Sequence, residues 1–191
     1  FATVLAGDFD DDGLTDIITV DRPDNALQIL FAGGSSSTTV GGGAFDAPVS
    51  FDAGTNPLAT AWGDYDGDGK TDLITLSGDN MVRVFRGNGN GTFQSALSFS
   101  SGTTTAGDLV AADFDANGKL DLLVSDATLG GARMFLNGAT TSSATLGSTR
   151  GELAVGLINT GGTLDVAYVS SGNIGFSFGD GAGDFVATTD L

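Results

Sequence analysis

Short apolar runs rich in Val, Ile, Phe and Thr recur along the chain, separated by clusters of Gly, Asp, Ser and Thr. β-Branched and aromatic residues in short runs bounded by turn residues are typical of β-strands. Gly interrupts nearly every longer segment in which apolar residues fall at helical spacing. The pattern therefore predicts an all-β protein.

An internal repeat organises these runs. A nine-residue acidic motif followed directly by an apolar run occurs in four copies, the last of them degenerate, at residues 8–16, 64–72, 113–121 and 157–165. A repeat of about 40–55 residues built from strands is the signature of propeller blades.

Each repeat divides into four strands, and the acidic motif connects the first to the second. We expect first strands at 2–6, 58–62, 109–112 and 153–157, and second strands at 17–20, 73–76, 122–125 and 166–169. Third strands are expected at 27–31, 81–85, 132–136 and 174–178, and fourth strands at 47–51, 94–99, 144–148 and 185–189. Gly-rich turns at 87–91 and 179–183 would join third to fourth strands, because glycine adopts the positive φ of tight hairpins.

The expected fold is thus all-β, with four four-stranded antiparallel repeats forming β-propeller blades. The blades would span about 1–54, 55–105, 106–150 and 151–191 of a single domain. A small four-bladed ring, part of a larger propeller, and a subunit that assembles edge to edge are all compatible with four repeats. Part of a larger propeller or assembly is the favoured interpretation, since uncovered blade edges invite pairing with another chain.

The motif Asp-x-Asp-x-Asp-Gly-x-x-Asp predicts a calcium site in each of the first three copies. Side chains at positions 1, 3, 5 and 9 and the backbone carbonyl at position 7 supply hard oxygen ligands, which suit Ca²⁺ better than the stricter Mg²⁺. An EF-hand is excluded because position 12 is Thr19, Thr75 or Val124 in place of Glu. The expected ligands of about three Ca²⁺ ions are Asp8, Asp10, Asp12, Leu14, Asp16, Asp64, Asp66, Asp68, Lys70, Asp72, Asp113, Asp115, Asn117, Lys119 and Asp121, with Leu14, Lys70 and Lys119 binding through their carbonyls.

The alternative is that these are ordinary solvated turns, because Asp and Gly are common turn residues. A turn needs only one Asp, whereas four converging carboxylates repel one another by about 1 kcal/mol per pair even in water. In the fourth copy Leu157, Asn159 and Gly161 stand where ligands belong, so that loop should be empty.

The sequence resembles the FG-GAP/VCBS repeat family, the blades of integrin α-like β-propellers. The resemblance rests on 7–16, 63–72 and 112–121, with similar later segments at 86–93 and 178–185. It implies calcium sites in the loops between the first two strands of a blade, an extracellular setting, and a role in adhesion or ligand binding. Such propellers usually close with about seven blades, and the Gly-Ala-Pro element of the integrin version is reduced here to residues 46–48.

Composition excludes several functions. All but one of the 24 acids are Asp, the exception being Glu152, and with 7 bases the net charge is −17. Nucleic-acid binding needs a basic face, which seven scattered bases cannot make. No apolar run is long enough to span a membrane. The absence of Cys and His removes thiol chemistry and the commonest general base, and we expect no enzyme.

Aromatic residues occupy repeated places. Phe9, Tyr65 and Phe114 share motif position 2, which favours an apolar lid that pins each loop to its blade. The sole tryptophan, Trp62, is expected to pack as a large buried anchor between blades, with sugar stacking as the alternative. Lys70 and Lys119 should point to solvent, and the glycosylation sequon at 90–92 coincides with a Gly-rich turn.

Two functions follow. The preferred one is a calcium-stabilised extracellular adhesion or assembly module, secreted or at the cell surface, that binds another protein or itself. The alternative is a carbohydrate-binding, lectin-like propeller; an accessory domain of a polysaccharide-degrading enzyme is a remote third. Extracellular calcium modules bind at about 10⁻⁴–10⁻³ M, which suggests the location. No signal peptide is recognisable, so we expect a mature chain or a fragment.

Overall fold

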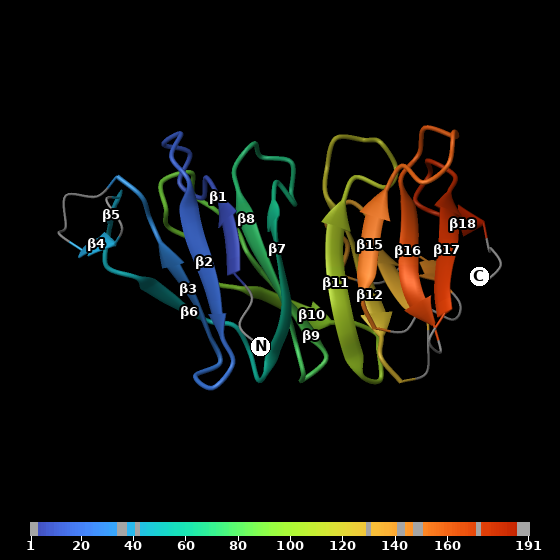
Figure 1. Cartoon of the computed structure of the whole chain (residues 1–191), viewed down its shortest axis with the longest axis horizontal. Helices are drawn as coiled ribbons and strands as arrows, with labels where there is room; N and C mark the ends of the chain where they lie inside the picture. Colours follow the sequence, from blue (N-terminus) through green and yellow to red (C-terminus); the bar gives the residue numbers. More distant parts are fainter. Residues whose placement is uncertain are drawn as a thin grey trace.

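The computed structural model describes residues 4–33, 38–40, 43–128, 131–140, 144–146, 151–170 and 173–186. Strands of alternating pattern pair with their chain neighbours into four antiparallel four-stranded sheets, as predicted (Figure 1). We call these sheets blades 1 to 4.

Each blade runs outward from its first strand. Blade 1 contains β1 (Val4–Gly7), β2 (Asp16–Asp21), β3 (Ala26–Leu30) and β6 (Val49–Asp52). Blade 2 contains β7 (Pro57–Gly63), β8 (Asp72–Ser77), β9 (Met81–Phe85) and β10 (Leu97–Ser100). Blade 3 contains β11 (Ala106–Ala112), β12 (Asp121–Asp126), β13 (Ala132–Phe135) and β14 (Ala144–Leu146). Blade 4 contains β15 (Leu153–Gly156), β16 (Asp165–Ser170), β17 (Asn173–Gly179) and β18 (Phe185–Val186).

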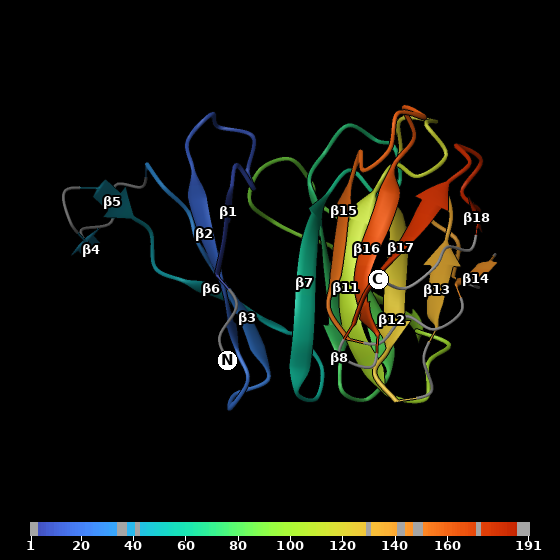
Figure 2. The same cartoon turned by 45° about the vertical axis from the view of Figure 1, so that its right-hand side comes forward.

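Some predicted boundaries were wrong. β6 begins after Pro48, not at residue 47, because proline has no N–H for the ladder. β10 begins at Leu97, three residues later than predicted, and β15 ends before the exposed Leu157. A two-stranded hairpin of β4 (Thr38–Val40) and β5 (Gly43–Phe45) inserts into blade 1 and was not predicted (Figure 2). The first three residues and residues 187–191, which include ends of predicted strands, lie outside the described part.

The hydrophobic core is divided among the junctions between blades. One cluster joins blades 1 and 2, a second joins blades 2 and 3, and a third joins blades 3 and 4. Because blades 2 and 3 pack on both sides, β8 and β12 are buried along their whole length, whereas β2 alternates between buried and half-buried residues. Each blade is therefore stabilised by its neighbours.

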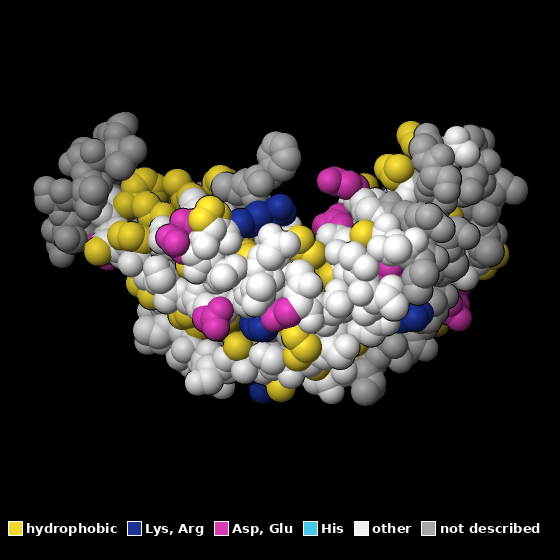
Figure 3. Space-filling view, turned by 90° about the horizontal axis from the view of Figure 1, so that it is seen from below, with side chains coloured by type: hydrophobic (Ala, Val, Ile, Leu, Met, Phe, Trp, Pro, Cys, Tyr) yellow, Lys and Arg dark blue, Asp and Glu magenta, His cyan; other side chains and the backbone are white. Residues whose placement is uncertain are grey.

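The four blades follow one another from blade 1 to blade 4 (Figure 1), and the molecule forms an open arc when seen from below (Figure 3). The first strands of blades 2, 3 and 4 are neighbours along this arc, since β7 packs against β11 and β11 against β15, while β7 contacts β2 of blade 1. The described residues thus form part of a propeller ring.

Candidate metal centres

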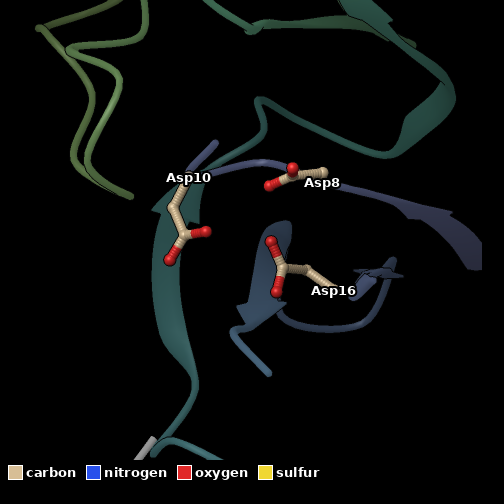
Figure 4. Close-up of side chains that lie close together, drawn as sticks. All are labelled: Asp8, Asp10 and Asp16. Atoms are coloured by element: carbon tan, nitrogen blue, oxygen red, sulfur yellow. The ribbon is translucent and has the colours of Figure 1, made fainter. Parts of the chain in front are cut away.

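The acidic motifs form the loops β1–β2, β7–β8 and β11–β12, which lie along the upper edge of the molecule in Figure 1. In the first loop the carboxylates of Asp8, Asp10 and Asp16 point toward one another, with one oxygen of each within 4.8 Å of the others (Figure 4). The second and third loops repeat this arrangement at positions 1, 3 and 9, with the clusters Asp64, Asp66, Asp72 and Asp113, Asp115, Asp121. Each cluster could hold a metal ion.

Position 9 is the most buried member of each cluster. Asp16, at the start of β2, accepts hydrogen bonds from the amides of Phe9 at 2.8 Å and Ala32 at 2.7 Å. Its carboxylate thereby ties the loop to the end of β3. Asp72 and Asp121 repeat both bonds, from Tyr65 and Gly87 and from Phe114 and Asn137.

Position 5 lies outside the clusters. The Oδ1 atoms of Asp12, Asp68 and Asn117 accept the amides of the position 7 residues Leu14, Lys70 and Lys119 at 2.7, 3.0 and 2.8 Å. This hydrogen bond from position 7 to the side chain at position 5 forms an Asx-type turn. The side chain at position 5 therefore fixes the backbone of position 7, whose carbonyl was predicted to be a ligand. The glycine at position 6 has a φ of 84–86° in these loops, as its role in a sharp turn requires.

Burial and repulsion between neighbouring negative charges raise the pKa of several carboxylates in the clusters. Burial, followed by the charges of Asp16 and Asp12, raises the pKa of Asp10. Burial also raises the pKa of Asp72 and Asp121, although backbone amides oppose the shift. A cation at the centre of each cluster would relieve this repulsion.

The third cluster contains an oxygen that lacks a partner among the described residues. Oδ1 of Asp115 is buried and accepts no hydrogen bond, while Oδ2 accepts the side-chain amide of Asn137 at 2.9 Å. That bond lowers the pKa of Asp115. A buried carboxylate oxygen without a donor is costly, so this donor set of oxygen atoms fits a hard cation such as Ca²⁺.

Two residues near the clusters were not predicted to be there. Nε of Arg86, directly after β9, lies 3.2 Å from Oδ2 of Asp66. Asn137, two residues after the end of β13, donates to Asp115. The only sequence signal is their place shortly after a third strand. Lys119 is exposed, as predicted, and its ammonium also donates to the carbonyl of Asp66 in the neighbouring β7–β8 loop at 3.4 Å. Lys70 pairs with Asp68 at 2.8 Å.

The fourth loop keeps the buried position 9 and lacks the other acids. Asp165 accepts the amides of Ile158, Asn159 and Gly179 at 2.9, 3.0 and 3.1 Å. Gly162 at position 6 retains a φ of 78°. The loop geometry therefore forms without an acidic cluster.

The aromatic side chains at position 2 are buried, so the predicted lids are confirmed for Phe9, Tyr65 and Phe114. The hydroxyl of Tyr65 donates to the carbonyl of Ala139, which links blade 2 to blade 3. The prediction for Trp62 was wrong in one respect. Its ring packs edge-on against Phe9 across the blade junction, but it is 40% exposed.

A hollow of about 280 Å³ lies at the junction of blades 2 and 3. It is lined by Trp62, Asp64, Asp113, Lys119 and Leu120. The hollow therefore places charged residues of two acidic loops beside the end of β7.

Four antiparallel blades with acidic loops between their first and second strands define a β-propeller-type repeat protein. Comparison with known families matches residues 8–75 and 64–124 to the FG-GAP-like repeat, which covers more than half of the chain. The chain belongs to the FG-GAP-like repeat family.

Two solved structures share the fold. One is an Agrocybe aegerita lectin that specifically recognises non-reducing terminal N-acetylglucosamine; it is 19% identical, with a TM-score of 0.66. The other, BBS1N in complex with ARL6DN, is 14% identical with a TM-score of 0.67. This chain is covered to 99% and 97%, but it spans only 51% and 55% of those chains. Comparison with curated protein sequences returns no match. Among the described residues no helix could cross a membrane.

Proposed function

We propose that this chain is a calcium-stabilised extracellular binding module whose repeats contribute to adhesion or assembly. The observation that carries the proposal is the repetition of the same three-carboxylate cluster in three successive loops. Family membership, the oxygen-only donor set and the unpartnered Oδ1 of Asp115 support it. The bound ion would supply positive charge to the clusters, and the residues themselves fix the loops and the blade junctions beside them.

Substituting position 3 of the acidic motif tests calcium binding in the same way in all four loops. We expect calcium to raise the free energy of unfolding by about 1–2 kcal/mol per site at ten or more times Kd. Asp10→Asn, Asp66→Asn and Asp115→Asn should each remove one site in calorimetric titration, with the calcium-dependent rise in Tm reduced accordingly. Asn159→Ala in the fourth loop is the control and should leave the stoichiometry unchanged. If calcium titration gave no binding heat and the melting curves in calcium and in EDTA were the same, the proposal would be contradicted.

Carbohydrate binding is a second candidate, favoured by the hollow beside Trp62. Trp62 is 40% exposed, and a pyranose ring stacks on aromatic side chains and donates hydroxyl hydrogen bonds to carboxylates such as Asp64 and Asp113. The N-acetylglucosamine-binding lectin among the structural neighbours supports this candidate. We do not propose catalysis at this site.

The candidate can be tested by fluorescence, because all indole emission comes from Trp62, which is one of the residues that line the hollow. N-acetylglucosamine should cause a saturable change in emission if the site binds that sugar, and Trp62→Ala should abolish retention on a glycan array. Mannitol at equal concentration controls for solvent effects. A protein with normal folding and no sugar-specific signal on the array would not be a lectin.

A further inference from the structure

Asn137, which lies outside the acidic motif, places its side chain against the third acidic loop. Its backbone amide donates to Asp121 at 2.8 Å, the bond that position 9 accepts in every loop. Its side-chain NH2 group donates to Oδ2 of Asp115 at 2.9 Å, and its side-chain oxygen accepts the NH2 group of Asn117. Asn137 therefore contacts positions 3, 5 and 9 of the motif at once.

The direction of these side-chain bonds is fixed at both ends. An ionised carboxylate only accepts hydrogen bonds, so the NH2 group of Asn137 must face Asp115. Oδ1 of Asn117 accepts the backbone amide of Lys119 at 2.8 Å, so the NH2 group of Asn117 is left to donate. The chain from Asn117 through Asn137 thus ends on the carboxylate whose Oδ1 is buried without a donor among the described residues.

The other loops have no such side chain. The residue that corresponds to Asn137 is Ala32 in the first loop, Gly87 in the second and Gly179 in the fourth, because each donates its backbone amide to position 9. A Cβ on either glycine would collide with a backbone carbonyl oxygen, so no side chain fits there. The contact with position 3 is therefore particular to blade 3.

The backbone turn explains part of this sequence. Asn137 and Gly138 have φ values of 56° and 75°, and the amide of Ala139 donates to the carbonyl of Leu136 at 3.0 Å. Asn-Gly is the preferred pair in tight turns with two positive φ angles. Glycine at position 137 would satisfy the turn equally well, however, and the turn requires no contact between a side chain and the acidic loop.

The third loop also has the weakest set of charges among the three clusters. Its position 5 is the neutral Asn117, where the first two loops have Asp12 and Asp68. Positions 1, 3, 5 and 9 therefore carry three carboxylates, against four in each of the first two loops. Because the charge of the ligands sets the affinity of a calcium site, the third loop needs another source of affinity to match the others.

An outer hydrogen bond is such a source, since it holds a ligand in place before the metal arrives. The second loop holds its position 3 residue, Asp66, through Arg86, whose positive charge opposes a nearby cation. Asn137 holds Asp115 without adding charge. The neutral partner is thus found in the loop with fewer carboxylates.

We propose that Asn137 is a positioning residue for the metal of the third loop. It holds Oδ2 of Asp115, leaves Oδ1 available to the ion, and so compensates for the neutral position 5. This inference rests on the proposed calcium function and adds to its third site a residue from outside the motif. Outer hydrogen bonds of this kind change metal affinity by about 10–100-fold.

The test uses a chain in which Asp10→Asn and Asp66→Asn leave the third site alone. In that background Asn137→Gly should weaken calcium binding at least about tenfold in calorimetric titration, because glycine keeps the turn and removes only the side chain. The Tm in EDTA should not change, since Asn137 is exposed. Asn56→Gly is the matched control: Asn56 is also exposed, has a φ of 50° and directly precedes β7, at the opposite end of that strand from the acidic loop, so calcium binding should stay the same.

The NH2 group of Asn137 provides a readout that a purely structural role would not change. Its NMR signals, assigned by their absence in Asn137→Gly, should shift as calcium fills the third loop. In Asp115→Asn they should not shift. A calcium-dependent shift that persists in Asp115→Asn would mean that Asn137 does not act through Asp115, and would overturn the inference.

The outcomes separate this inference from the calcium proposal. Equal calcium affinity with asparagine and with glycine at position 137 overturns the inference and leaves the calcium function standing. A fall in Tm that is as large in EDTA as in calcium assigns Asn137 to folding alone and also overturns it. A third loop that binds no calcium even with Asn137 present removes the proposed function at this loop and the inference with it. In the otherwise unchanged chain, Asn137→Gly should weaken one calcium site and leave the other two.

Discussion

The ninth residue of each acidic motif is a buried carboxylate that holds backbone amides from two separate segments. Asp165 does this in a loop without an acidic cluster, where it accepts three backbone amides and the side-chain amide of Asn159. We infer that the position 9 carboxylate stabilises each blade independently of any metal.

Replacing Asp165 by alanine should therefore destabilise the protein equally in calcium and in EDTA. The substitution leaves several part-buried amides without their protein acceptor, at a cost of about 1–3 kcal/mol. Urea unfolding in both buffers measures it. Asp10→Ala is the comparison, because its effect should appear mainly in calcium. A loss for Asp165→Ala that depends on calcium would show that the fourth loop binds metal after all.

Prediction from the sequence was limited most clearly at this position. The motif predicts position 9 as a metal ligand, but it does not show that the same carboxylate accepts backbone amides, because the partners Ala32 of Asp16 and Gly179 of Asp165 lie beyond the next strand. The strands were easier to predict from the sequence, because the alternation of apolar and polar residues indicates which side of a sheet is buried. The β4–β5 hairpin was missed because its Ser-, Thr- and Gly-rich surroundings have the composition of a loop.

At the scale of elements, the β8–β9 hairpin contains an ion pair that should make its stability depend on pH. The guanidinium of Arg83 donates to Oδ1 and Oδ2 of Asp79 at 3.3 and 2.7 Å and also contacts Ser77. The hydrogen bonds from Arg83 lower the pKa of Asp79 below its ordinary value of 3.8. The pair is part-exposed, so we expect a contribution of about 1 kcal/mol.

A lowered pKa in the folded state means that this contribution is present above pH 3.8 and is lost as the pH falls through the folded-state pKa. Asp79→Asn should thus be less stable than the wild type at pH 7, and the difference should shrink as the pH falls below 3.8. Urea unfolding in EDTA at pH 7 and at a series of pH values below 3.8 measures it. Asp24→Asn, at an exposed turn between β2 and β3, is the control and should have little effect at either pH. A difference that grows on acidification would contradict the assignment.

At the scale of the whole molecule, stability comes from packing between blades, since each hydrophobic cluster draws residues from two of them. Repeat proteins of this kind are held together by nearest-neighbour interfaces. The number of blades in the ring could not be predicted from the repeats, because closure depends on the angle between blades and on what covers the two open faces.

The same substitution on equivalent sheet faces should therefore have different effects in blades 2 and 4. Val82 and Val169 lie in equivalent rows, but Val82 is fully buried against blade 3, whereas Val169 is 46% exposed. Val82→Ala removes two buried methyl groups and leaves a cavity, so it should lower the free energy of unfolding by about 2 kcal/mol. Val169→Ala should lower it by less than about 0.5 kcal/mol, because that side chain is already half exposed. Urea unfolding of both variants measures the difference. Equal losses for the two variants would mean that the outer face of blade 4 is covered in solution.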